Sequence, residues 1–278
     1  MRRTLDVAAL QLAADVGRPR RNLDRVVAAA RAAAGADLIV TPELVTTGYD
    51  LAVIRERGHE LAEPADGPAV TLTAELAAEL DATIVLGLLE RDGDVLYDTA
   101  AVVTPSGAVS LFRKTHLYPA EVGLFTAGEE LITVDTPVAR LGPLICFEHA
   151  FPELATTLAL AGAQVLVIPS AVPVGYEYLL ELRTRARAQD NQVFAVGCNL
   201  TAVGCNLTGG GFCGRSLIAG PRGEVLARGS TAEETVRARL DLSAIARERA
   251  QEPALRLRRP ALYAPDRVGA AGSGEARS

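Results

Sequence analysis

Short apolar runs alternate with helical patterns in the first half of the chain. Residues 6–12 and 37–43 are apolar runs typical of strands, and residues 20–35 between them form an alanine-rich amphipathic pattern that ends at Gly35. This order predicts a β-α-β opening. A second helical pattern covers residues 67–81. Three further strand candidates, separated by the turn signals RDGD and PSG, follow at residues 83–90, 98–105 and 108–114.

The same alternation returns in the second half of the chain, after residues 131–137. Strand patterns cover residues 141–146, 164–170 and 193–198, and helical patterns cover residues 151–162 and 176–191. Strands that are apolar on both faces must be covered by helices, and the pattern divides the chain evenly. The sequence therefore predicts two sheets packed face to face with helices outside. The expected fold class is α/β, a four-layer α-β-β-α sandwich.

Chain length and the composition of the C-terminus give the expected domain organisation. A chain of 278 residues is long for one average domain and short for two, and a single α/β structure can absorb this length. We therefore expect one domain over residues 1–265. Residues 266–278 are mostly small, polar and glycine-rich, a composition typical of linkers, so we expect a flexible tail there.

The distribution of charge limits the classes of partner. The net charge is −6 and the sequence has no long block of basic residues, which argues against nucleic acid and anionic membranes as partners. The N-terminal apolar run is interrupted by Asp6, Gln11 and Asp15, so we expect neither a signal peptide nor a membrane span. These observations predict a small-molecule ligand and a cytoplasmic location.

Residues 195–201 and 202–208 are two tandem copies of AVGCNLT. Because seven is odd, the second copy cannot continue the strand without presenting the opposite face, which predicts a loop after the strand. The alternative is a reshaped pocket rim. The four cysteines are few and oddly spaced for a disulfide framework, so free thiols are expected. Three of them are also too widely spaced, with no histidine nearby, to favour a zinc site: Cys198, Cys205 and Cys213.

Three strand ends carry side chains suited to acyl transfer. Cys146 ends an apolar run just before a helix that is expected to begin near Pro152, where a nucleophile could project from a rigid element. Glu43 ends another apolar run, and Lys114, the single lysine among 28 Lys and Arg residues, ends a third. A thiol, a carboxylate and an ammonium are the set that thioester chemistry needs. Taken alone, Cys146 is also compatible with a buried structural cysteine.

At these residues the chain resembles the nitrilase superfamily of carbon-nitrogen hydrolases. The motifs that carry the resemblance are TPELVTTGY, FRKTHLY and ICFEHAFPE, with AEVGLFTAGEE, RARAQDNQVFAV and SLIAGPRGEVLA extending it over about residues 5–242. The resemblance implies the α-β-β-α sandwich, no cofactor, and a homodimer or higher homo-oligomer. It also implies hydrolysis of a small amide to carboxylate and ammonia.

The same resemblance implies roles for individual residues. Glu43 would take the proton of Cys146, whose thiolate attacks the amide carbonyl, and would later activate water against the thioester. Lys114 and the backbone N–H of Phe147 would hold the oxyanion. Glu121 would orient the substrate amide and help to place the water. The resemblance further implies four substrate-binding residues, namely Tyr49, Phe147, Glu148 and Ala171.

The sequence departs from the amidase pattern after the cysteine. Many amidase-like members have an aspartate two residues after the cysteine, whereas here Phe147, Glu148 and His149 follow it, similar to true nitrile hydrolases. The stretch from Phe151 to Glu153 is similar to amidases. Because RKTHLY, PADGPA and RARAQDNQ resemble the branch that acts on short aliphatic and amino-acid amides, an amidase is favoured. A nitrilase and an N-carbamoyl amidohydrolase stay as alternatives.

Two further alternatives involve other chemistry or none. His149 or His116 could pair with Cys146 in a Cys-His dyad, but Glu43 would then have no function. His59 lies in a charged helical context and is expected at the surface. A binding or regulatory protein without catalysis predicts loss of one or more of the three catalytic side chains, and none is lost.

Overall fold

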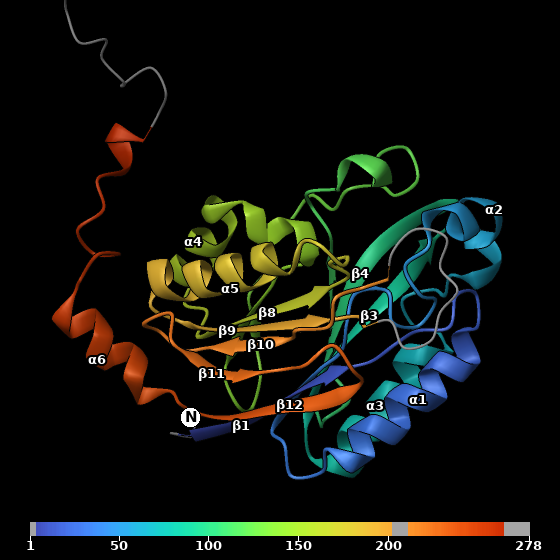
Figure 1. Ribbon diagram of the computed structural model, residues 1–278, viewed down its shortest axis with the longest axis horizontal. Coiled ribbons are helices and arrows are strands. Elements are labelled where there is room, and N and C mark those ends of the chain that lie inside the picture. The colour runs from blue at the N-terminus through green and yellow to red at the C-terminus, as the bar shows by residue number, and fades with distance from the viewer. Residues whose placement is uncertain (1–3, 202–210, 264–278) are drawn as a thin grey trace, which may run out of the picture.

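Two six-stranded sheets stack face to face in the computed structural model, which describes residues 4–201 and 211–263 (Figure 1). The first sheet has the order β12-β1-β2-β3-β4-β5. Strands β1, β2 and β3 run parallel, and β4, β5 and β12 are antiparallel to their neighbours. The strands span β1 Thr4–Gln11, β2 Leu38–Val40, β3 Thr83–Asp92, β4 Val95–Val103, β5 Val109–Arg113 and β12 Glu234–Asp241.

The second sheet repeats this arrangement in the other half of the chain. Its order is β11-β10-β9-β8-β7-β6, with β7, β8 and β9 parallel and the outer strands antiparallel. The strands span β6 Val134–Asp135, β7 Arg140–Pro143, β8 Val165–Ser170, β9 Phe194–Asn199, β10 Leu217–Ala219 and β11 Val225–Arg228. The internal similarity seen in the sequence thus corresponds to one mixed sheet per half.

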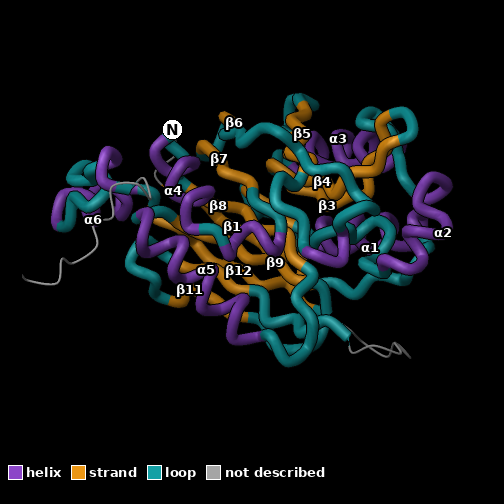
Figure 2. Tube along the Cα trace, turned by 90° about the horizontal axis from the view of Figure 1, so that it is seen from above, coloured by secondary structure: helices purple, strands orange, loops and turns teal. Residues whose placement is uncertain are grey.

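Helices cover the outer face of each sheet. Helices α1 and α3 lie on the first sheet, and α4 and α5 lie on the second, as Figures 1 and 2 show from two directions. Proline stands in the first turn of α1, α3 and α4, where its missing N–H has no helical partner to lose. The helices span α1 Pro19–Ala32, α2 Leu51–Leu61, α3 Pro68–Leu80, α4 Pro152–Leu160, α5 Glu177–Asn191 and α6 Ser243–Gln251.

Three layers of apolar side chains join these elements. Between the sheets, residues such as Val7 and Val40 of the first sheet share a buried cluster with Val167 and Val196 of the second. One further cluster joins the first sheet to α1 and α3, and another joins the second sheet to α4 and α5. The four-layer α-β-β-α sandwich expected from the sequence is confirmed. Within residues 4–201 and 211–263, none of the helices combines the length and apolar character that a bilayer span requires.

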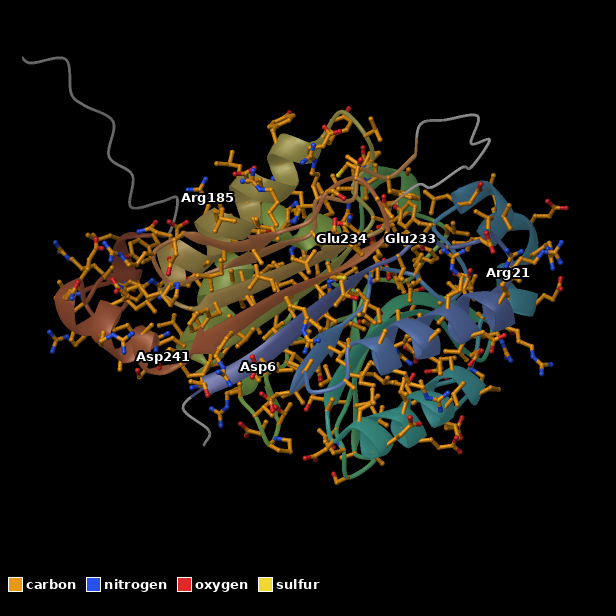
Figure 3. The ribbon with its side chains drawn as sticks, turned by 60° about the horizontal axis from the view of Figure 1, so that its bottom comes forward. Asp6, Arg21, Arg185, Glu233, Glu234 and Asp241 are labelled. Carbon is orange, nitrogen blue, oxygen red and sulfur yellow. The ribbon has the colours of Figure 1, made fainter. Side chains whose placement is uncertain are left out.

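Strand β12 links the two halves of the chain. It follows β11 of the second sheet but pairs along its whole length with β1 of the first, from Thr4 opposite Asp241 to Gln11 opposite Glu234. Figure 3 shows Asp6 and Asp241 at the same end of this pair. The first sheet is therefore completed by an edge strand that is far from β1 in sequence.

The structure corrects the strand expected at residues 141–146. Strand β7 ends at Pro143, and Cys146 begins a 3-10 helix, Cys146–Ala150. The Ile145 N–H donates to the Glu148 carboxylate at 2.7 Å rather than continuing the sheet, and Cys146 has a left-handed φ of 42°. Cys146 therefore lies in a turn beyond the strand, where the Glu148 side chain binds the backbone N–H that precedes it.

The structure tests some of the remaining expectations, and others fall on residues that it does not describe. The charged segment around His59 lies in α2, a helix whose bounds the hydrophobic periodicity did not predict. Asp50 caps this helix, because its side chain accepts from the N–H groups of Ala52 and Val53. Most of the first AVGCNLT copy lies in β9. The second copy, with Cys205, and the tail at 266–278 lie outside the described residues, so their expected conformations stay predictions, as does the single domain over residues 1–265.

Candidate active site

Lys114 lies directly after β5 and is almost completely buried. Its Nζ atom contacts Glu43 Oε1 at 2.5 Å, Glu121 Oε1 at 2.8 Å and Asp98 Oδ2 at 3.1 Å. All three carboxylates are buried. Because an ammonium has three N–H donors and no acceptor, this arrangement uses its full hydrogen-bonding capacity.

Glycines allow the backbone around the cluster to pack closely. Glu43 follows β2 in a turn against Gly87 of β3, where an added Cβ would lie 2.1 Å from the Pro42 carbonyl oxygen. The Gly87 N–H donates to the Thr41 side chain at 3.0 Å, which fixes the same turn. Gly128 allows the same close approach of backbone beside Lys114. The Lys114 carbonyl accepts from the Gly128 N–H at 2.9 Å. Side chains at either glycine would displace the backbone that carries Glu43 or Lys114.

The cluster holds three carboxylates around one ammonium in a buried setting. Burial raises the pKa of Glu43 well above its usual range, and the charges of Asp98 and Glu121 add to this effect while Lys114 opposes it. Burial favours the neutral amine of Lys114, but the three carboxylates outweigh it and hold the lysine pKa above its usual range. The lysine therefore stays charged, and Glu43 is the group poised to gain a proton.

The carboxylate oxygens of Glu43, Asp98 and Glu121 lie within 4.8 Å of one another, close enough to share a metal ion. The Lys114 ammonium bonds to all three and occupies the position that a cation would take. We therefore read this group as a charge cluster built around lysine.

Cys146 lines a pocket that Lys114 and Glu121 of this cluster also line. Its positive φ is a conformation that only a few per cent of non-glycine residues adopt, and such strain is concentrated at functional sites. Burial raises the pKa of the thiol, as does the charge of Glu43, whereas Lys114 and a hydrogen bond from the Ala171 backbone lower it. The thiol is thus held protonated at rest and needs a base to become a nucleophile.

The pocket has a volume of about 440 Å³ and mostly apolar and aromatic walls. Tyr49 packs edge-on against Phe212, and Tyr118 packs edge-on against Phe147. The Tyr49 hydroxyl donates to Glu121 Oε1 at 2.5 Å. This size suits a small molecule. The charged or ionisable side chains in the lining are Asp50, Lys114, Glu121, Cys146, His149 and Arg183, together with three tyrosines.

The structure brings together most of the expected substrate-binding residues. Tyr49, Phe147 and Ala171 line the pocket with Cys146, but Glu148 does not. The Glu148 carboxylate accepts instead from Ile145 N at 2.7 Å, from Thr115 N at 2.8 Å and from Thr115 Oγ1 at 2.6 Å. It ties the turn that carries the cysteine to the segment after Lys114. Burial raises the Glu148 pKa to about 7, against the opposing effect of these hydrogen bonds.

The histidines offer no partner to the thiol. His149 Nε2 lies 3.3 Å from Arg183 Nη1, and burial followed by the charges of Arg183 and Arg187 lowers the His149 pKa to about 3. His116 packs against the Phe151 ring. Among the described residues, neither histidine forms a hydrogen bond with Cys146, so the structure gives the Cys-His dyad no support. His59 is exposed on α2.

The other described cysteines have structural surroundings. The Cys198 thiol lies between the sheets, where it donates to the carbonyls of Leu10 and Val40. Cys213 is buried beside the Asn199 side chain. Among residues 4–201 and 211–263, all three cysteines are free thiols, as expected.

Asp98 is a member of the cluster that sequence reasoning missed. It lies inside β4, although the apolar pattern placed it at the start of a strand. A signal was present, because Asp98 is the one charged residue of the stretch VLYDTAAVV, which is otherwise mostly apolar. A carboxylate inside such a strand needs a buried cation, and the chain has one lysine nearby in sequence.

Comparisons with known proteins assign the chain to a family. A family model of carbon-nitrogen hydrolases matches residues 6–250. A protein named nitrilase from Pyrococcus abyssi is 36% identical over 234 residues, which is 83% of this chain and 87% of that protein. An (R)-stereoselective amidase from a Pseudomonas species is 33% identical over 223 residues, 80% of each chain.

Solved structures agree with these relatives. A mutant of the amidase from Nesterenkonia sp. AN1 superposes with a TM-score of 0.80 at 26% identity, over 93% of this chain and 95% of that one. In that structure the acetamide moiety of fluoroacetamide is covalently added at the active-site cysteine. The fold, the family model and these similar proteins thus define an enzyme of the nitrilase superfamily. The chain belongs to the carbon-nitrogen hydrolase family.

Proposed function

We propose that this enzyme hydrolyses a small linear amide to its carboxylate and ammonia through a thioester on Cys146. Glu43 is the base, Lys114 holds the positive charge beside it, and Cys146 is the nucleophile. The main support is the different hydrogen bonding of the two carboxylate oxygens of Glu43. Oε1 contacts Lys114, whereas the buried Oε2 accepts from none of the N–H or O–H donors of the described residues and lies in the same carboxylate cluster as Asp98. We infer that this oxygen takes the thiol proton.

The first half of the reaction forms the thioester. Glu43 takes the Cys146 proton as the sulfur bonds to the amide carbon, and the carbonyl oxygen becomes an oxyanion. The backbone N–H of Phe147, the residue directly after Cys146, is the expected oxyanion donor. Lys114 can donate to the same oxygen only by releasing one of its three carboxylates. When the C–N bond breaks, the proton held by Glu43 passes to the nitrogen and ammonia leaves.

The second half of the reaction releases the acid. Glu43 takes a proton from water, the resulting hydroxide attacks the thioester carbon, and the C–S bond breaks as the sulfur regains its proton. Glu121 is suited to orient the substrate amide, because within the described residues its Oε2 accepts from Tyr118 N alone, at 2.7 Å, and has capacity for a second donor. General base catalysis contributes about 10²–10⁴-fold, so the oxyanion donors are needed as well.

The test is a substrate panel that measures ammonia release from matched amides, nitriles and N-carbamoyl compounds. The amide of each acyl group should have the highest kcat/KM, and the variants Cys146→Ala and Glu43→Gln should lose turnover. A higher kcat/KM for the nitriles or for the N-carbamoyl compounds would replace amide hydrolysis by that activity. If no compound released ammonia above the level of Cys146→Ala, a binding role without catalysis would replace the proposal.

We also infer a homo-oligomer in solution, through the helix layer on the second sheet. Tyr178 and Leu182, one helical turn apart on α5, expose 62% and 61% of their surface. Neighbouring apolar side chains on a surface layer suit association. Light scattering after size exclusion should give a dimer or larger species, and Leu182→Glu should dissociate it. A monomeric wild type would contradict this. The cytoplasmic location stays a prediction for cell fractionation.

A further inference from the structure

Arg183 differs from the other charged groups of the pocket because no acid in the described part of the chain pairs with it. Lys114 has three carboxylate partners. Asp50 is engaged in capping α2, where its Oδ1 accepts from two backbone N–H groups. Among the described residues, Arg183 forms no ion pair, and its one hydrogen bond joins Nη1 to His149 Nε2 at 3.3 Å.

Neighbouring arginines on α5 differ in this respect. Arg185 lies 3.4 Å from Glu181 and donates to the Gly223 carbonyl at 2.8 Å, and Arg187 lies 3.9 Å from Asp190. The segment at residues 202–210, which is next to the pocket residue Phe212 in sequence, contains no Asp or Glu. It therefore cannot supply a carboxylate to Arg183.

His149 fixes the guanidinium without adding charge. A guanidinium can only donate, so the His149 Nε2 atom must accept and the ring proton must lie on Nδ1. The ring is neutral because burial, with Arg183 and Arg187, lowers its pKa to about 3. The bond uses one of the five N–H donors of Arg183. Since Arg183 lines the pocket, the remaining donors are available to a ligand there.

Apolar side chains make up much of the pocket lining. Leu179, one helical turn before Arg183, lines the pocket together with Phe147 and Val172. Such a wall favours methylene groups over polar ones. The Arg183 guanidinium suits a carboxylate, because it can bind the two carboxylate oxygens with two parallel hydrogen bonds.

We propose that Arg183 binds a carboxylate on the acyl part of the substrate, so that the preferred substrates are monoamides of small dicarboxylic acids. This inference rests on the proposed amide hydrolysis at Cys146. It goes further by naming the substrate class and the residue that selects it. His149 is a positioning residue that orients the guanidinium.

The experiment compares three amides of equal chain length: glutaramate, pentanamide and 5-aminopentanamide. Ammonia release gives kcat/KM for each. The wild type should prefer glutaramate over pentanamide by roughly 10- to 100-fold, the range that a charge-assisted hydrogen bond contributes. Arg183→Gln should remove most of this preference, and Arg183→Lys should keep part of it. His149→Asn should weaken it.

The matched control is Arg185→Gln. Arg185 is two residues away on the same helix and is exposed (Figure 3). It is not among the residues that line the pocket. Its variant removes the same charge from α5 and should leave the ratio of the two kcat/KM values unchanged. Melting temperatures of all variants establish that each is folded, and Arg183→Lys retains the test if Arg183→Gln does not fold.

Each remaining outcome decides a different question. Equal kcat/KM for glutaramate and pentanamide in the wild type would overturn the role of Arg183 and leave amide hydrolysis intact. So would a preference for 5-aminopentanamide, which would assign selection to Asp50. If none of the three amides nor any other amide in the substrate panel were hydrolysed, the proposed function itself would fail.

Discussion

The Asp98 carboxylate lies 3.1 Å from the Lys114 ammonium, in the same buried cluster as Glu43. The charge of Asp98 raises the pKa of Glu43, after the larger effect of burial. In the proposed mechanism Glu43 must be ionised to take the thiol proton. Asp98→Asn removes the neighbouring charge and so lowers the Glu43 pKa. The acidic limb of the kcat/KM profile should therefore move to lower pH.

The control for this shift is Glu90→Gln. Glu90 is another buried carboxylate of the same sheet, paired with Arg113 and Thr99, and it does not contact Lys114. Its variant should lower the melting temperature and leave the acidic limb in place. An Asp98→Asn profile that coincides with that of the wild type would mean that Asp98 does not set the ionisation of the base.

Lys114→Arg tests whether charge alone is sufficient at the cluster. The three carboxylates surround one compact ammonium at 2.5–3.1 Å, and a planar guanidinium cannot place one nitrogen between all three. We expect kcat/KM on the best amide to fall at least about 10²-fold, the effect of removing one oxyanion donor. The wider side chain should also destabilise the fold by about 1–3 kcal/mol, because Lys114 is buried among three carboxylates. Turnover near the wild-type value would show that any cation suffices.

Among the cysteines, only Cys146 should be essential. Cys146→Ala should abolish ammonia release, because no other thiol lines the described pocket. Cys198→Ala and Cys213→Ala should retain turnover, with a loss of stability from their buried positions. Cys205→Ala is also expected to retain turnover. Wild-type activity in Cys146→Ala would remove the thioester mechanism.

His149 should make the protein less stable in mild acid. Its pKa is about 3 in the folded protein against an ordinary value of 6.5, so the unfolded chain binds the proton more strongly. The stabilising contribution is complete above pH 6.5 and is lost as the pH falls toward 3. Between pH 7 and pH 5 the wild type should lose about 2 kcal/mol more than His149→Gln.

The measurement is denaturant unfolding of both proteins at several pH values. Glu148, whose pKa is raised to about 7, acts in the opposite direction between pH 4.5 and 7, since its stabilising contribution falls as the pH rises. Because both proteins contain it, its effect cancels in the difference. Parallel stability curves for the two proteins would mean that His149 takes up its proton in the folded state.

The sequence predicted the layers of the fold well, because helices and buried strands leave distinct periodicities. It also placed Glu43, Lys114 and Cys146 at element ends, and the resemblance added Glu121. The exact end of β7 was not predictable from hydrophobicity, because residues 141–146 are apolar whether or not they are in a strand.

Contacts between residues far apart in sequence escaped prediction. Glu148 follows the nucleophile and was expected at the substrate, but its carboxylate turns back to Thr115 and Ile145. Arg183 was one of many arginines, and only the fold places it in the same pocket as Cys146. A charge pattern along the chain does not record which arginines pair with acids in three dimensions.

The central claim is that Cys146 carries the acyl group, and mass spectrometry tests it most directly. The enzyme is mixed with its best amide, quenched in acid within the first turnovers, and analysed intact and after proteolysis. Glu43→Gln supplies a variant in which an adduct, once formed with an activated acyl donor, should persist because its hydrolysis lacks the base. We predict a mass increase equal to the acyl group, located on the peptide that contains Cys146. Steady turnover with no adduct in either protein, or an adduct on another residue, would contradict the account.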